Sequence, residues 1–309
     1  MGGKADRFET TLVRFTPGMS PPAIRRACGC NQLPAPRVSA SPSMTFRTLC
    51  TMLALGLSVV LINSAQTSTD KGKQMIDRAV AALGGDRFVN MKNRVASGRV
   101  YLFFQDELRG LDIAKIYTEY LPEKAAKGLA LREREVLGKK QDYSYLFLED
   151  QAWDITYRGA RPVDDETWDR YARTTESDIL YILKVRLNEP GMTFDYVGTD
   201  VYLSTHVEIV DITDAQNRTI RVYFDHNTML PVHETYSWLD PDTKQRNDAE
   251  TVFDKYRDVG GVMWPYSIER SRNGYKTYQM FATSVQIDQP LPPKIFELPP
   301  GAKVLRKVG

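Results

Sequence analysis

The stretch that decides the fold runs from Arg218 to Ile287 and alternates apolar with polar residues. It opens with Thr219-Ile-Arg-Val-Tyr-Phe224 and Leu230-Pro-Val-His-Glu-Thr-Tyr-Ser-Trp238, which are separated by a segment of turn composition. A period of two is typical of strands with one buried face, and it predicts three further strands at 250–257, 262–271 and 275–287. Asn273-Gly274 between the last two is a strong hairpin signal, because both residues accept positive φ. We therefore predict a five-stranded antiparallel meander whose apolar face must be covered.

The chain before this stretch extends the sheet. Seven more strands are predicted, at 93–104, 111–120, 128–137, 143–148, 152–157, 195–202 and 206–213. Gly98 inside the first of them indicates a bulge or a close backbone approach. No Gly/Ser-rich or Pro-rich linker interrupts residues 93–287, so we expect one continuous sheet. The predicted fold class is α+β but mainly β: a large curved antiparallel sheet, or unclosed β-barrel, of about 11–12 strands with helices as a lid.

Helical periodicity occurs in two places. Residues 70–83 form an amphipathic pattern that Gly84-Gly85 ends, and residues 164–173 and 176–187 are helical in the middle of the chain. Thr175-Glu-Ser-Asp178 fits a capping box at the start of the last helix. That helix carries an apolar stripe of Ile179, Leu180, Leu183 and Leu187. We expect the helices to cover the apolar face of the sheet, with this stripe as the lid.

Charge and cysteine content differ between the first 65 residues and the rest of the chain. The first 65 residues hold 7 Lys/Arg and 2 Asp/Glu, which leaves 34 basic and 37 acidic residues in the remainder. No basic stripe is present, so the sequence argues against nucleic acid as a partner. Cys28, Cys30 and Cys50 all precede residue 66. The remainder therefore has no disulfide, no thiolate nucleophile and no cysteine metal ligand.

The N-terminal residues are expected to contribute no folded core. Residues 1–43 have the composition of a disordered extension, which indicates a misassigned start upstream of Met44. A short basic region, an apolar run and small residues at 44–65 are typical of a secretory signal peptide, with cleavage near Ala65. The alternative is an uncleaved signal anchor behind a cytoplasmic tail. We predict a single domain at 66–309 that is exported to the periplasm. The tail at 303–309 is expected to be frayed.

Two stretches of the meander point to a known family. Phe224-Asp-His-Asn-Thr-Met-Leu-Pro-Val232 and Tyr256-Arg-Asp-Val-Gly-Gly-Val-Met-Trp-Pro265 resemble the outer-membrane lipoprotein-sorting proteins (LolA/LolB-like), in the stand-alone form found in acidobacteria. Ala81-Ala-Leu-Gly-Gly85 and the C-terminal Phe296-Glu-Leu-Pro299 fit the same group, and the resemblance covers residues 71–300. It implies an unclosed antiparallel barrel with helices over an apolar cavity, which in well-studied members holds the acyl chains of lipoproteins.

Polar clusters give no convincing catalytic or metal site. His206 and Glu208 share one sheet face, but His226 and His233 lie on other predicted elements, and zinc needs three or four converging ligands. The acidic groups at 164–166 and 240–242 lie where helix starts and turns favour Asp. We therefore predict no catalytic residue, no metal and no cofactor.

The aromatic residues of the meander are the stronger candidates. Six residues are predicted to line a ligand cavity: Tyr236, Trp238, Trp264, Tyr266, Ile268 and Phe281. Phe281 is expected to share a face with Val285 and Ile287 because the three are spaced by even numbers. The alternative is that these side chains are ordinary sheet core.

Three functions are consistent with this sequence. The first is a non-catalytic periplasmic carrier or chaperone that holds a lipid or a lipidated protein, and each buried methylene would contribute about 0.8 kcal/mol. The second is an envelope sensor or protein-interaction module with the same fold, with an inner- or outer-membrane protein as its partner. The third is a hydrolase that uses the Asp and His residues. We rank them in that order.

Overall fold

The computed structural model describes residues 67–122 and 128–307, which belong to the unit Ser64–Gly309 of the chain. The predicted extension at 1–43 and the signal peptide at 44–65 lie outside the described residues. Among the residues that are described, no helix has the length and apolar character needed to cross a membrane.

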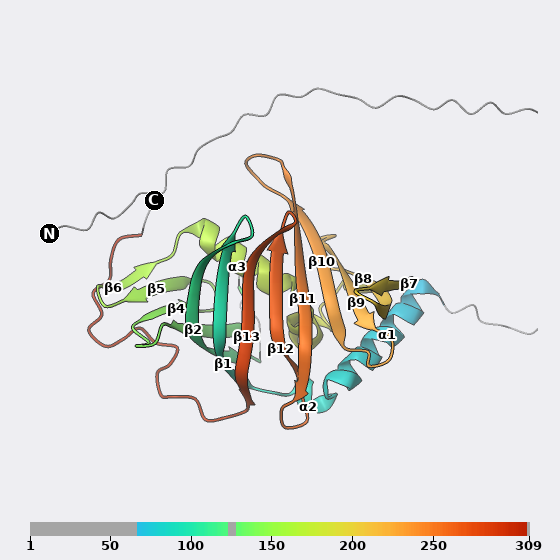
Figure 1. Ribbon diagram of the computed structural model, residues 1–309, viewed down its shortest axis with the longest axis horizontal. Coiled ribbons are helices and arrows are strands. Elements are labelled where there is room, and N and C mark those ends of the chain that lie inside the picture. The colour runs from blue at the N-terminus through green and yellow to red at the C-terminus, as the bar shows by residue number, and fades with distance from the viewer. Residues whose placement is uncertain (1–66, 123–127, 308–309) are drawn as a thin grey trace, which may run out of the picture. The chain divides into compact units, whose positions relative to one another are not determined.

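The described residues form one sheet of 13 antiparallel strands, which confirms the predicted fold class (Figure 1). The strands are β1 (Asn93–Phe104), β2 (Glu107–Tyr120), β3 (Leu131–Leu137), β4 (Tyr143–Phe147), β5 (Ala152–Thr156), β6 (Gly159–Pro162), β7 (Thr193–Tyr202), β8 (Thr205–Thr213), β9 (Thr219–Asp225), β10 (Pro231–Leu239), β11 (Arg246–Asp258), β12 (Met263–Arg272) and β13 (Tyr275–Ile287). Their spatial order is β6-β5-β4-β3-β2-β1-β13-β12-β11-β10-β9-β8-β7. The sheet thus consists of two meanders that join where β1 pairs with β13, and it stays open between its edge strands β6 and β7.

The predicted strand count was short by one strand, β6. Its four residues are too few to show an alternating pattern. The C-terminal tail covers this edge: Val304 bridges Ala160 in parallel, and the Ala160 N–H donates to the carbonyl of Lys303 at 2.9 Å. The expectation that the tail is frayed was therefore wrong at residues 303–305, because unpaired backbone groups of an edge strand favour such pairing.

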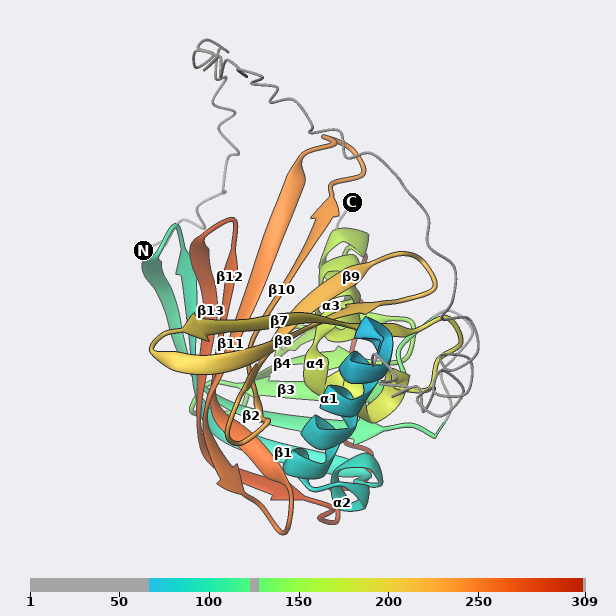
Figure 2. The ribbon, with the colours of Figure 1, turned by 90° about the vertical axis from the view of Figure 1, so that its right-hand side faces the viewer.

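The helices are α1 (Ser68–Leu83), α2 (Asp86–Val89), α3 (Asp165–Ser177) and α4 (Ile179–Tyr181), followed by a π-helical turn η1 (Ile182–Arg186). Thr67 caps α1, because its hydroxyl accepts a hydrogen bond from the Asp70 N–H at 3.0 Å. Gly84 ends α1 with a φ of 124°, as the sequence predicted. Figure 2 shows α1, α3 and α4 on one side of the curved sheet.

The predicted capping box at Thr175–Asp178 was wrong. Helix α3 continues through Ser177, and Asp178 is the N-cap of α4, where its carboxylate accepts from the N–H groups of Leu180 (2.8 Å) and Tyr181 (3.3 Å). Asp at an N-cap satisfies these donors directly, so no partner three residues earlier is needed. The predicted helix at 176–187 is therefore the end of α3 followed, after a break at Asp178, by α4 and η1.

The main core lies between the sheet and the helices α1, α4 and η1. Its fully buried members include Ile76 and Leu83 of α1, Leu183 of η1, and Phe253 of β11. A Cβ on Gly72 of α1 would lie 2.2 Å from the carbonyl oxygen of Phe194 on β7, so α1 packs closely against that strand. Helix α3 contributes no buried residue. It is covered by the sheet on one side only, and it overlies the feature that we consider next.

Candidate functional site

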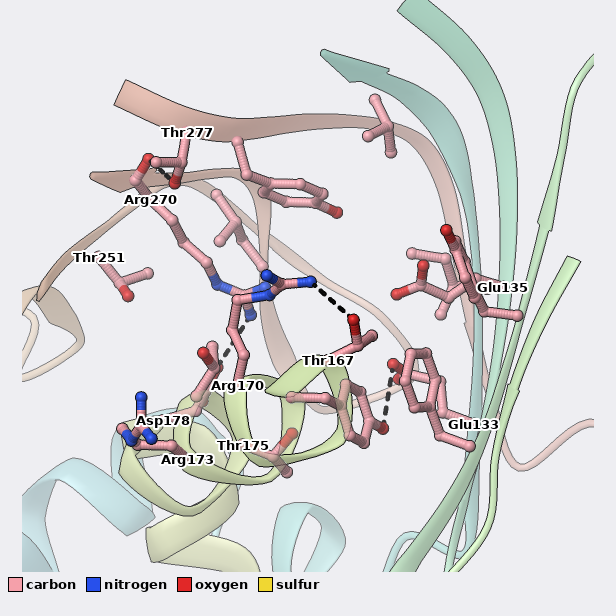
Figure 3. A pocket seen from close by; sticks show the side chains of 18 of the residues that line it. Glu133, Glu135, Thr167, Arg170, Arg173, Thr175, Asp178, Thr251, Arg270 and Thr277 are labelled. Atoms are coloured by element: carbon pink, nitrogen blue, oxygen red, sulfur yellow. Dashed lines mark hydrogen bonds and ion pairs between the residues drawn. The ribbon is translucent and has the colours of Figure 1, made fainter. Parts of the chain in front are cut away.

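A cavity of about 760 Å³ lies between α3 and the inner face of the sheet (Figure 3). Its walls come from β1 to β6, from β10 to β13, and from α3 and α4. Apolar lining residues include Val100, Ile116, Leu131, Leu137 and Phe147. Ligand pockets in proteins range from about 300 to 1,000 Å³, so the cavity has the size of a small-molecule site.

Four of the six residues predicted to line a cavity do line this one: Tyr236, Trp238, Trp264 and Ile268. Tyr266 packs instead against the main core, with the guanidinium of Arg257 at 4.4 Å from its ring centroid. Strands β10 and β12 therefore place these four side chains along the cavity, and Tyr266 lies toward the core. Whether these side chains contact a ligand remains a prediction.

Phe281 lies on the opposite face of the sheet. Its ring packs edge-on against Tyr101 at 5.9 Å, and Lys255 lies over it at 4.9 Å. The reason is a β-bulge: β13 pairs Ser284 with Ser97 but Ala282 with Gly98, which leaves Thr283 as an extra residue. An extra residue reverses the faces of the residues on its two sides. The predicted common face for Phe281 and Val285 was therefore wrong, whereas the predicted bulge at Gly98 is confirmed.

The residues predicted to form the lid are mostly core residues. Ile179 and Leu183 are fully buried and belong to the main core, and Leu187 packs against it from its edge. Only Leu180 of this set lines the cavity. The element that overlies the cavity is α3, through Thr167, Arg170, Tyr171, Arg173 and Thr174.

The cavity also holds a polar network that the sequence analysis did not predict. The Thr118 hydroxyl donates to Oε2 of Glu133 at 2.7 Å, and Arg94 donates to the Thr118 hydroxyl at 2.9 Å. The Tyr171 hydroxyl of α3 donates to Oε1 of Glu133 at 3.4 Å, and the Tyr171 ring stacks on Phe147 at 3.6 Å between centroids. Helix α3 is therefore held to the sheet at this point by a long hydrogen bond and an aromatic stack, and its half-buried Trp168, Tyr171 and Ala172 pack against Leu129, Leu131 and Tyr181.

Glu135 follows Glu133 on the same face of β3 and also lines the cavity (Figure 3). Among the described residues it has neither a hydrogen bond nor an ion pair. Burial, and to a smaller extent the neighbouring Glu133, raise the pKa of Glu135, which lies at about 8. Arg270 and Arg94 lower it, but they do not compensate. Glu135 is therefore largely protonated at neutral pH.

Arginine side chains line the cavity on four elements, β1, β6, α3 and β12. Arg270 of β12 and Arg170 of α3 both point into it (Figure 3). Arg173 and Arg272 hold their guanidinium groups 4.6 and 5.4 Å from the ring of Trp238. One strand pattern contained a signal for this arrangement: Trp264, Tyr266, Ile268, Arg270 and Arg272 alternate along β12, apolar at one end and cationic at the other.

The remaining polar candidates have structural roles. His226 pairs with Glu208 at 2.7 Å, and His233 is buried against the rings of Tyr202 and Tyr223. Asp164 caps α3 by accepting from the Thr167 N–H at 2.6 Å. Across the described ranges, no three His, Cys, Asp or Glu side chains are grouped so that they could hold a metal ion.

Comparison with protein-family models gives no match, and comparison with curated proteins gives none either. Solved structures do match. A DUF1329 family protein from Desulfovibrio piger has a TM-score of 0.52 at 11% identity, with 73% of this chain and 97% of that chain covered. The chain shares the fold of that protein. A domain assigned to an outer membrane lipoprotein-sorting protein from Vibrio parahaemolyticus has a TM-score of 0.49 at 8% identity, covering 74% of this chain and 97% of that chain.

A LolA superfamily protein from Nitrosomonas europaea also matches, with a TM-score of 0.43, 9% identity, and coverage of 73% of this chain and 96% of that chain. Lipoprotein-sorting and LolA structures are thus among the structural neighbours, as the sequence resemblance predicted, and a DUF1329 structure, which it did not predict, is another. At these identities the likeness concerns the fold, and function has to be argued from the cavity.

Proposed function

We propose that this protein is a non-catalytic carrier that holds the acyl chain of a lipid or a lipidated protein in the cavity beneath α3. The cavity carries the proposal. Its volume of about 760 Å³ suits a small amphiphile, and Val100, Ile116, Leu131 and Ile268 give it apolar walls. Each methylene buried there would contribute about 0.8 kcal/mol, so an acyl chain could bind without covalent chemistry.

The construction of the lid supports reversible loading. Helix α3 has no buried residue, whereas α4 and η1 are built into the core. Segments with few buried contacts open at low free-energy cost. In this proposal α3 moves away from the sheet, and α4 stays in place as part of the cavity wall. The carrier would act in the periplasm and exchange its cargo with an inner- or outer-membrane protein.

Native mass spectrometry with lipid extraction tests the proposal, on protein secreted into a bacterial periplasm. We expect a one-to-one amphiphile adduct on the wild-type protein. Leu137→Trp places an indole among the cavity walls and should abolish the adduct. The matched control is Ile113→Trp, because Ile113 is 48% exposed and does not line the cavity. A wild-type protein that carries no adduct, and takes up no fluorescent fatty acid on titration, would overturn the proposal.

A further inference from the structure

We propose that the cavity selects amphiphiles with an acidic head group, a carboxylate or a phosphate, and that Arg270 and Arg170 bind this group. The inference rests on the proposed carrier function and adds the chemical class of the ligand. It starts from the guanidinium groups that enter the cavity and from what each of them contacts.

Arg270 is the first of these groups, and its hydrogen-bonding capacity is largely unused. The nearest carboxylate oxygen, Oδ2 of Asp178, lies 3.7 Å from its Nη2, which is beyond hydrogen-bond distance. Its Nε is buried and has no hydrogen-bond partner in the part of the chain that the structure describes. About a third of the side chain, 34%, is still accessible, and the residue lines the cavity. A guanidinium placed in this way has donors available for a planar anion.

Arg170 brings a second guanidinium from the opposite wall. It lies on α3, and its hydrogen bond to the Thr167 hydroxyl is long, at 3.4 Å. Within residues 67–122 and 128–307 it forms no ion pair. Figure 3 shows Arg170 and Arg270 reaching into the cavity from the helix and from β12. An anion between them would therefore join the lid to the sheet.

The carboxyl groups near these arginines are already engaged or protonated. Asp178 caps α4 through its Oδ1, and its Oδ2 forms an ion pair with Arg270 at 3.7 Å, so it offsets part of the charge of that arginine. Glu234 accepts the N–H of Ile179, and burial raises its pKa well above the usual range. Glu135 faces the cavity with a pKa of about 8. Burial thus disfavours the charged form of both carboxyl groups, which limits how far they offset the charge of the arginines.

Two other carboxylates of the lining accept hydrogen bonds from the protein itself. Glu133 accepts from Thr118, and Asp164 accepts from the Thr167 N–H. Asp154 is paired with Arg161 in the register of β5 and β6, but its buried Oδ1 has no hydrogen-bond partner in the part of the chain that the structure describes. The arginines and the apolar walls thus share one cavity, as binding a charged head and an apolar chain requires. Arginine suits carboxylate and phosphate groups in particular, because its planar fork matches their geometry.

Fluorescence titration with cis-parinaric acid and its methyl ester tests the inference, because the two probes have the same chain and differ in charge. We expect the wild-type protein to bind the acid about tenfold more tightly than the ester, as charge-assisted hydrogen bonds are the stronger ones. Displacement by lysophosphatidic acid, compared with a monoacylglycerol, extends the test from carboxylate to phosphate. We expect the charged competitor to be the stronger one.

The variants are Arg170→Ala and Arg270→Gln, with Arg158→Ala as the control because Arg158 is exposed and does not line the cavity. Arg170 is exposed on a helix that has no fully buried residue, so Arg170→Ala should retain folding. We expect it to weaken binding of the acid about three- to tenfold and to leave the ester unchanged. Equal affinity of the wild-type protein for acid and ester would overturn this inference and leave the carrier function standing. A protein that binds neither probe would overturn both.

Discussion

The carboxyl group of Glu234 on β10 accepts a hydrogen bond from the backbone N–H of Ile179 at 2.7 Å. Glu234 is 1% exposed, and this contact anchors the first turn of α4 to the sheet. Glu234→Ala should lower the free energy of unfolding by about 1–3 kcal/mol, because it leaves a buried donor without a partner. Equilibrium denaturation in urea measures the change.

Glu234→Gln is the matched variant. Burial raises the pKa of Glu234 well above its usual range and so favours the neutral carboxyl, for which an amide is the closest substitute. Gln keeps an acceptor for Ile179, so we expect a smaller loss than for Ala. If the two variants were equally unstable, the hydrogen bond to Ile179 would not be the reason.

The fold could be predicted from the sequence because apolar residues recur at every second position along each strand and recognisable turns join the strands. It predicted the lid less well, since burial of Ile179 and Leu183 comes from contacts with distant strands. An apolar stripe on a helix indicates that the helix is covered, and it does not indicate whether the helix can move. Helix α3, which overlies the cavity, carries only a short stripe of half-buried residues, Trp168, Tyr171 and Ala172.

The same limit applies to the cavity. Leu131, Glu133 and Glu135 alternate on one face of β3, so the sequence placed two carboxyl groups on the inner side of the sheet. Interpreting them as cavity residues required the partner strands, which the local pattern does not provide. The prediction that Phe281 shares the inner face was wrong for a related reason. The extra residue Thr283 reverses the faces along β13, and the alternating pattern does not show it.

The aromatic stack between Tyr171 and Phe147 should control the opening of α3. The ring centroids are 3.6 Å apart and the rings lie within 9° of parallel. Aromatic pairs contribute about 0.5–1.5 kcal/mol beyond their buried area, so Phe147→Ala should speed amide hydrogen exchange in residues 165–177 about three- to tenfold. Phe104→Ala is the control, because Phe104 is 60% exposed and does not line the cavity. Unchanged exchange in α3 would mean that other contacts hold the helix.

The close approach of α1 to β7 predicts a cost for the smallest possible substitution. A Cβ at Gly72 would lie 2.2 Å from the Phe194 carbonyl oxygen and 2.9 Å from the Tyr196 nitrogen. Ala is otherwise favoured over Gly in a helix by about 1 kcal/mol. We expect the clash to dominate, and Gly72→Ala to lower the free energy of unfolding by about 1–3 kcal/mol.

Gly110→Ala is the matched control for this substitution. Its added Cβ would meet the Leu102 side chain at 3.6 Å, an ordinary contact distance. Urea denaturation of both variants gives the comparison. A Gly72→Ala protein as stable as the wild type would show that α1 can shift away from β7 at little cost.

Glu135 predicts how stability depends on pH. Its pKa is raised from 4.5 to about 8 in the folded protein, so between these values the folded state holds a proton that the unfolded chain releases. The free energy of unfolding must then fall as pH rises through this window, because the folded state binds more protons. Glu135→Gln removes this dependence. We expect its advantage in urea midpoint over the wild type to grow from about pH 4 to about pH 8 and then to stay constant.

The groups that face Glu135 decide the size of this effect. Glu133 raises its pKa, and Arg270 and Arg94 lower it, so the variant isolates one member of a charged set. Glu107→Gln provides the control, because the Glu107 side chain is 70% exposed and solvent screens its charge. The control should follow the wild type at every pH. A constant difference between Glu135→Gln and the wild type across the window would mean that Glu135 is ionised in the folded protein. The cavity would then carry one more negative charge at neutral pH, which would oppose the binding of an acidic head group beside Arg270.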